Sequence, residues 1–161
     1  MLAAIAFVSE ADARGANDRT FDVEIIAEGL NKPMAIATNS PRTLYYSEVP
    51  DPGGFGGENA VKRLNLQSGE SSLISLGEPY PINIALDRRG NVYWTCKTAG
   101  VILKYSRSSG TKAPFYPMDF DPTTTEPEDR LMMPSGITVD RHGDVLFTEV
   151  PDPGNVGMNM V

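Results

Sequence analysis

The chain is poor in the residues that most often carry catalytic or metal chemistry. Its 161 residues include one cysteine, Cys96, and one histidine, His142. A single cysteine excludes an intrachain disulfide, and a single histidine argues against a histidine pair or a histidine-based metal centre within this chain. His142 lies between Arg141 and Gly143 in a predicted hairpin turn, which favours a surface position. Cys96 ends an apolar strand, which favours a buried packing role over a reactive thiol.

Basic residues and long apolar runs are also scarce. Lys and Arg number 14 against 21 Asp and Glu, so the net charge is -7. The sequence pI is about 4.7. An acidic surface argues against binding to a nucleic-acid backbone or to an anionic membrane, because both require a basic footprint. No apolar run has the length needed to cross a bilayer. The acidic composition leaves several classes of partner open: cations, sugars, neutral small molecules and basic proteins. It also fits an acidic surface that contacts only solvent and binds no partner.

The amino terminus has a composition of its own. Residues 2–8 form a short apolar run, and Ala11-Asp12-Ala13 is a small-x-small site typical of signal-peptide cleavage, although no basic segment precedes it. Residues 1–18 are therefore interpreted as a signal-peptide remnant or a disordered N-terminus, and residues 19–161 as the folded part. This interpretation predicts export to the periplasm or the extracellular space, and leaves a cytoplasmic location open.

Three stretches of the chain repeat the same pattern without a gap, namely residues 33–47, 81–95 and 134–148. Each has proline first, isoleucine at the fourth position, a polar turn in the middle and an aromatic residue at the fourteenth position. The turns carry Asp, Asn and Gly, which suit tight hairpins, and the flanking runs are rich in β-branched and aromatic residues. A period of about 50 residues is typical of a repeat architecture.

Two further strands follow the repeated hairpin in the first two units, which makes four antiparallel strands in each. Such units are typical of β-propeller blades. The fold class predicted is therefore all-β, a partial β-propeller of about two and a half blades. The blades are expected at about 31–77, 78–118 and 131–161, with a closing strand at 22–29. An incomplete ring predicts either a fragment of a longer chain, which the pattern favours, or self-association that completes the ring.

The repeats resemble those of six-bladed propellers with NHL or YWTD repeats. Residues 134–140 (Pro-Ser-Gly-Ile-Thr-Val-Asp) and 90–95 (Gly-Asn-Val-Tyr-Trp-Thr) follow the NHL pattern. Tyr93-Trp94-Thr95 also matches the start of the YWTD motif, where Cys96 replaces the aspartate. The resemblance covers residues 22–161 and implies a fold related to the gluconolactonase-like (SMP-30-like) and virginiamycin B lyase-like propellers. It does not identify an activity, because function depends on the site and not on the fold.

An acidic six-residue motif, Glu-Val-Pro-Asp-Pro-Gly, occurs at 48–53 and again at 149–154. Its prolines stiffen the loop and remove amide donors, so the carboxylates leave the sheet in a fixed direction. Asparagine follows each copy, and carboxylate and amide oxygens suit Ca²⁺ or Mg²⁺. The resemblance to metal-dependent lactonases implies the same kind of ligand set. The candidate metal ligands are Glu48, Glu149, Asp51, Asp152, Asn59 and Asn159.

A structural role competes with each of these interpretations. Acidic residues at this repeat position can bond backbone groups of their own or a neighbouring blade. The aromatic residues Tyr46, Trp94 and Phe147, which share one repeat position, are expected to pack between blades and not to line a sugar site. The sequence therefore predicts a propeller that serves as a ligand- or protein-binding scaffold. A fragment or subunit of a divalent-metal-dependent lactonase or lyase is the alternative, so catalysis stays an open question.

Overall fold

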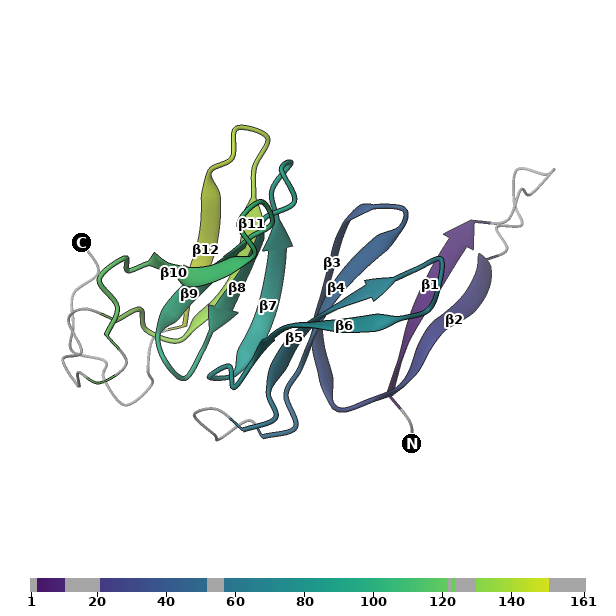
Figure 1. Ribbon diagram of the computed structural model, residues 1–161, viewed down its shortest axis with the longest axis horizontal. Coiled ribbons are helices and arrows are strands. Elements are labelled where there is room, and N and C mark those ends of the chain that lie inside the picture. Colours follow the sequence, from purple (N-terminus) through teal and green to yellow (C-terminus); the bar gives the residue numbers. More distant parts are fainter. Residues whose placement is uncertain (1–2, 11–20, 52–56, 122, 124–129, 151–161) are drawn as a thin grey trace.

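The computed structural model describes residues 3–10, 21–51, 57–121, 123 and 130–150, and within them it consists of strands joined by turns (Figure 1). Two four-stranded antiparallel sheets occupy the middle of the chain, and a two-stranded sheet lies at each end. The prediction of an all-β fold with four-stranded antiparallel blades is confirmed. The described residues contain no helix long and apolar enough to cross a membrane.

The two complete sheets, called here the first and second blades, have the same simple topology. Each runs inner strand, second, third and outer strand in chain order, with neighbours hydrogen-bonded. The first blade contains β3 (Pro33–Ser40), β4 (Thr43–Glu48), β5 (Ala60–Asn65) and β6 (Ser71–Leu76). The second contains β7 (Pro81–Leu86), β8 (Val92–Cys96), β9 (Val101–Ser106) and β10 (Thr111–Tyr116).

The two-stranded sheets flank these blades. β11 (Pro134–Val139) and β12 (Val145–Glu149) form the inner half of a third blade, and β11 lies beside β7 as β7 lies beside β3. At the other end β1 (Ala3–Glu10) pairs with β2 (Phe21–Leu30). The sequence pattern leaves residues 1–18 outside the fold and predicts a single closing strand at 22–29. The structure instead places much of the first segment in β1, which is the partner of that strand.

Aspartates order the hairpin turns between the first two strands of a blade. In the second blade, Asp87 accepts hydrogen bonds from the amides of Arg89 and Asn91 and from the Asn91 side chain. Burial raises the pKa of Asp87, but these bonds together lower it below its ordinary value. In the third, three successive amides after Arg141 donate to Asp140. These bonds explain why the second and third repeats begin this turn with a short acidic side chain.

The main core lies between the first and second blades. One face of the second blade, called here the Trp94 face, packs against Tyr45 and Val61 of the first. Trp94 has no exposed surface, and Tyr46 is also buried, so the predicted packing role is confirmed for both. Phe147 is half-buried and contacts the ring of Tyr116. The buried residues of the Trp94 face are Ile84, Val92, Trp94, Cys96, Val101 and Leu103.

Candidate functional site

The segment that enters each inner strand has the same unusual backbone in all three repeats. Lys32, Tyr80 and Met133 have φ of 50°, 58° and 43°, values that side chains other than glycine rarely adopt. In each repeat the carbonyl of this residue accepts a hydrogen bond from the residue that follows the second strand. A hydrogen bond between the residue before the inner strand and the residue after the second strand therefore holds this strained backbone in place. It also brings the preceding linker close to the end of the second strand.

The first acidic candidates hold these linkers in place. Glu48 accepts a hydrogen bond of 3.0 Å from the amide of Asn31, and an ion pair of 2.5 Å from Lys62. Glu149 accepts a hydrogen bond of 2.9 Å from the amide of Met132, which is the equivalent bond in the third blade. Both carboxylates thus satisfy a backbone donor two residues before the inner strand. The competing structural role accounts for the contacts of both.

The remaining metal-ligand candidates divide into described and undescribed residues. Asn59 is fully buried and exchanges two hydrogen bonds with the backbone of Asp51, of 3.1 and 2.8 Å. Asp152 and Asn159 lie outside the described residues. Within the part of the chain that is described, no three His, Cys, Asp or Glu side chains gather in a group able to hold a metal ion. The metal site therefore stays a prediction.

The second blade departs from this pattern in two coupled positions. Pro79 stands where Asn31 and Met132 donate their amides, and Cys96 stands where Glu48 and Glu149 accept them. Proline has no amide hydrogen, so no acceptor is needed at that point. The carboxylate is instead supplied by Glu78, the residue before the proline.

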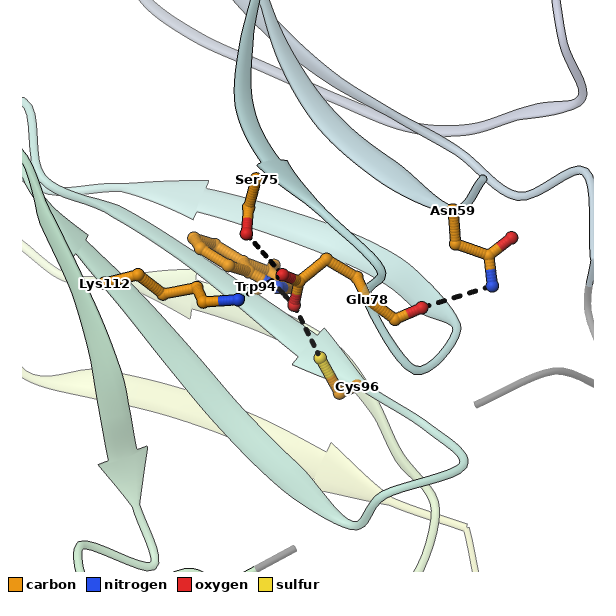
Figure 2. A network of polar contacts seen from close by, with 6 residues as sticks. All are labelled: Asn59, Ser75, Glu78, Trp94, Cys96 and Lys112. Carbon is orange, nitrogen blue, oxygen red and sulfur yellow. Dashed lines mark hydrogen bonds and ion pairs between the residues drawn. The ribbon is translucent and has the colours of Figure 1, made fainter. Parts of the chain in front are cut away.

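Glu78 lies at the centre of a buried polar network (Figure 2). Its carboxylate accepts hydrogen bonds from Ser75, from the indole of Trp94 at 3.0 Å, and from Lys112 at 2.6 Å. The thiol of Cys96 lies 3.8 Å from the same carboxylate. A buried carboxylate is stable only when it is paired and hydrogen-bonded, and here Ser75 of the first blade and Trp94 and Lys112 of the second supply the donors.

Asn59 fixes the backbone that carries this carboxylate. Its carbonyl accepts the amides of Gly77 and Glu78, and its side chain donates to the carbonyl of Glu78 at 3.2 Å. One buried asparagine thus connects the acidic loop at Asp51 with the linker between the blades. It acts here as a structural bridge between two loops.

The environment of Cys96 suppresses thiol chemistry. Burial raises the pKa of the Cys96 thiol well above its ordinary 9.0, and the nearby Glu78 carboxylate raises the pKa further. Lys112 acts in the opposite direction but does not overcome these effects. The expectation of a buried, unreactive packing cysteine is confirmed for burial, since the side chain has no exposed surface.

We expect the Cys96 thiol to resist a thiol-specific disulfide reagent in the folded protein at mildly alkaline pH, and to react fully in denaturant. Stability should also fall as the pH rises above about 9, because the unfolded thiol ionises there while the folded thiol keeps its proton. A Cys96→Ala control should flatten that part of the pH profile in urea titrations. Equal labelling rates with and without denaturant would contradict this description of the site.

A cleft of about 430 Å³ opens beside the network. Its walls are largely apolar, and its charged groups are the Glu78–Lys112 pair and Arg130, whose guanidinium lies 5.7 Å from the centre of the Phe120 ring. Glu78 has no exposed surface, whereas the Lys112 side chain is 40 % exposed. The cleft therefore combines a largely apolar lining with one partly exposed lysine. Its lining residues are Gly77, Glu78, Pro79, Ala99, Val101, Leu103, Lys112, Pro114, Phe120 and Arg130.

A tight backbone approach positions the Arg130 side of the cleft. The amide of Leu131 donates to the carbonyl of Gly100 at 2.8 Å. Gly100 has φ of 66°, and a side chain there would collide with the carbonyl of Leu131. The sequence motifs did not point to this cleft. The sequence does carry one signal for it. In the second repeat, Pro79 replaces the residue that donates its amide in the other repeats, and Cys96 replaces the glutamate that accepts it.

No family model and no curated protein sequence matches the chain. Solved structures match it in fold. A chain in the crystal structure of a nidogen/laminin complex aligns with a TM-score of 0.64 and 17% identity, covering 88% of this chain and 49% of that one. The virginiamycin B lyase of Staphylococcus aureus aligns with a TM-score of 0.55 and 17% identity, covering 90% and 39%. A streptogramin B lyase gives 0.54 and 18%, covering 89% and 38%.

These likenesses concern architecture, because the identities are low. The chain spans about half the length of the nidogen-complex chain and less than half of the two lyases. Two complete blades flanked by two half-blades agree with that share of a closed ring. Its fold is therefore that of a partial six-bladed β-propeller, similar to the propellers of these proteins.

Proposed function

We propose that the protein is a binding propeller, and that the cleft beside Glu78 and Lys112 receives a small apolar molecule that carries one acidic group. The observation that supports the proposal best is the cleft itself. Its volume of about 430 Å³ lies within the range of small-molecule sites, and apolar side chains such as Val101 and Leu103 form most of its wall. Apolar walls with a few convergent polar groups are typical of such sites.

The charges of the cleft favour an acidic ligand. Glu78 is covered by its donors and has no exposed surface, so a ligand does not meet its charge directly. Lys112 gives a hydrogen bond to Glu78, and an ammonium carries three N–H donors, so it can also donate to an anion at its exposed side. Arg130 also lines the cleft, but its charge interacts with that of Asp121, so the argument rests on Lys112. A carboxylate next to an apolar body would match both features.

Isothermal titration calorimetry with 1-naphthoate tests this proposal, with the neutral 1-naphthamide as the matched ligand. We expect the acid to bind about tenfold more tightly than the amide, because a hydrogen bond to a charged group is stronger than one between neutral groups. Pro114→Trp, at the rim of the cleft, should weaken binding at least about tenfold by filling space. Ala113→Trp, on the opposite face of β10, should leave the affinity unchanged.

Equal affinities for the two ligands would contradict the acidic-ligand proposal. Equal effects of the two tryptophan substitutions would contradict the location, and circular dichroism of both variants confirms that the comparison is between folded proteins. The metal-dependent lactonase or lyase alternative has no described cluster in its favour, and export to the periplasm or extracellular space likewise stays a prediction.

A further inference from the structure

We propose that the hairpin turns of the second and third blades bind a short acidic peptide of a partner protein. The surface, called here the arginine surface, consists of Arg88, Arg89, Arg107 and Arg141, all of them exposed. The turns that join β7 to β8 and β11 to β12 lie at the same end of their blades, at the top of Figure 1. None of these arginines lines the cleft, so the proposal does not depend on the ligand proposed there.

The arginine surface contrasts with the charge of the chain as a whole. The net charge is -7, and the loops and strand ends at the other end of the blades carry several carboxylates. Examples are Glu48, Asp51, Glu58, Glu78 and Glu149. A local excess of positive charge at one end favours the approach of an acidic segment to that end and repels it from the other.

Three of the arginines gather around Gly90. Arg88 and Arg89 precede it in the inner turn, and Arg107 comes from the outer turn of the same blade. A side-chain carbon at Gly90 would lie 2.9 Å from both Cδ and Nη1 of Arg107, so this arginine lies directly against the inner turn. The amide of Arg107 also donates to the Asn91 side chain at 3.1 Å. Like charges held this close repel one another, and an anion bound between them would relieve the repulsion.

The aspartate of the same turn does not neutralise this cluster. The Oδ1 atom of Asp87 accepts the amides of Arg89 and Asn91, both at 2.9 Å. Its Oδ2 atom accepts the Asn91 side chain at 2.7 Å and the Tyr93 hydroxyl at 3.2 Å. These four bonds occupy the acceptor positions of the carboxylate. Among the described residues, no ion pair joins a carboxylate to any of the three arginines.

The third blade extends the surface through Arg141. In its turn, Asp140 accepts three successive backbone amides. The bond from the Asp144 amide is the main cause that lowers the pKa of Asp140, and the charge of Arg88 contributes, which places the two turns close together. Arg141 uses its Nε to donate to Nε2 of His142 at 3.0 Å. Its terminal nitrogens can therefore donate to a ligand.

The pattern of charges favours a peptide over a dense polyanion. Asp87, Asp140 and the exposed Asp144 alternate with the arginines along the two turns. A sulfated glycan would bring closely spaced anionic groups against these aspartates. A peptide whose acidic residues are separated by neutral ones can meet the guanidiniums alone, and a carboxylate matches the two parallel donors of arginine. An extended peptide also has the shape to cross two neighbouring blades.

Fluorescence anisotropy tests the proposal with a peptide of alternating Glu and Gly that carries a neutral dye. The matched peptide has Gln in place of Glu. At low salt we expect the Glu peptide to bind at least about tenfold more tightly than the Gln peptide, and its affinity to fall as NaCl screens the charges. Equal affinities of the two peptides, or no binding of the Glu peptide, would overturn the proposal.

Two triple variants of equal net charge test the location. Arg88→Gln, Arg89→Gln and Arg107→Gln together should weaken binding about tenfold, because three exposed charge contacts of modest strength are lost. The control combines Lys32→Gln, Arg63→Gln and Lys97→Gln, which lie outside the arginine surface, and should change the affinity less than about twofold. Circular dichroism confirms that both variants are folded, and Arg89→Gln alone should weaken binding about threefold.

Equal losses in the two triple variants would overturn the location, because they would show attraction to the total charge and not to this surface. A heparin-derived hexasaccharide, measured by competition against the dye-labelled peptide, tests the class of partner. We expect it to compete less well than the unlabelled Glu peptide. Stronger competition by the hexasaccharide would overturn the assignment to an acidic peptide.

Discussion

Trp94→Ala lowers the free energy of unfolding by about 4 kcal/mol, as expected when a fully buried tryptophan is truncated. Trp94 has no exposed surface and lies in the centre of the core between the first and second blades. Its indole also donates the 3.0 Å hydrogen bond to Glu78. The substitution therefore leaves a cavity and removes one donor from a buried carboxylate, and both effects act in the same direction.

Urea titrations followed by far-ultraviolet circular dichroism measure this loss, since the substitution removes the only tryptophan of the chain. All variants are compared at one protein concentration, because self-association would stabilise the folded state by mass action. Tyr116→Ala is the control. This aromatic side chain is half exposed, so we expect a loss below about 1 kcal/mol. A loss for Trp94→Ala no larger than that of the control would show that the core lies elsewhere.

Lys112→Met lowers the free energy of unfolding by about 2 kcal/mol, because it leaves the Glu78 carboxylate buried without its cation. Breaking a fully buried pair costs about 3–5 kcal/mol, and the partial exposure of Lys112 reduces that figure. Methionine keeps most of the apolar stem, so lost packing contributes little. The effect belongs to the charge and not to the side-chain volume.

A double-mutant cycle with Glu78→Gln separates these contributions. The double variant should lose less stability than the sum of the single variants, because Lys112→Met does no electrostatic harm once residue 78 is neutral. Lys97→Met is the matched control, since its ammonium lies 5.8 Å over the Tyr80 ring and is worth about 0.5–1 kcal/mol at most. Additive losses in the cycle would mean that the 2.6 Å contact contributes no coupling.

The repeat pattern was enough to predict the blades. Residues within a hairpin determine its turn and its packing. In the second blade, the Asp87 side chain accepts the turn amides, and Trp94 is buried at the aromatic position. These are local signals: the aromatic position recurs in all three repeats, and the aspartate turn recurs in the second and third. The role of the acidic residues was harder to predict, because Glu48 and Glu149 have the chemistry of metal ligands and yet bind backbone amides. Only the position of the partner amide distinguishes the two roles.

The candidate site was not predictable from motifs, because its parts come from distant segments. Glu78 lies in the linker between the first and second blades, Lys112 on the outer strand of the second blade, and Arg130 in the connection to β11. No spacing rule joins such residues, since blade packing brings them together. The second repeat does depart visibly from the other two, because Cys96 replaces their glutamate and Pro79 replaces their amide donor. This departure marks the blade where the cleft lies.

The most direct test of the binding proposal is a titration of the isotope-labelled protein with 1-naphthoate, followed by the chemical shifts of the backbone amides. The proposal predicts shift changes concentrated at Glu78, Ala99, Val101, Leu103 and Lys112, which line the cleft. It predicts small changes along the inner strands β3, β7 and β11. Changes confined to those inner strands, or no change on saturation with ligand, would contradict it.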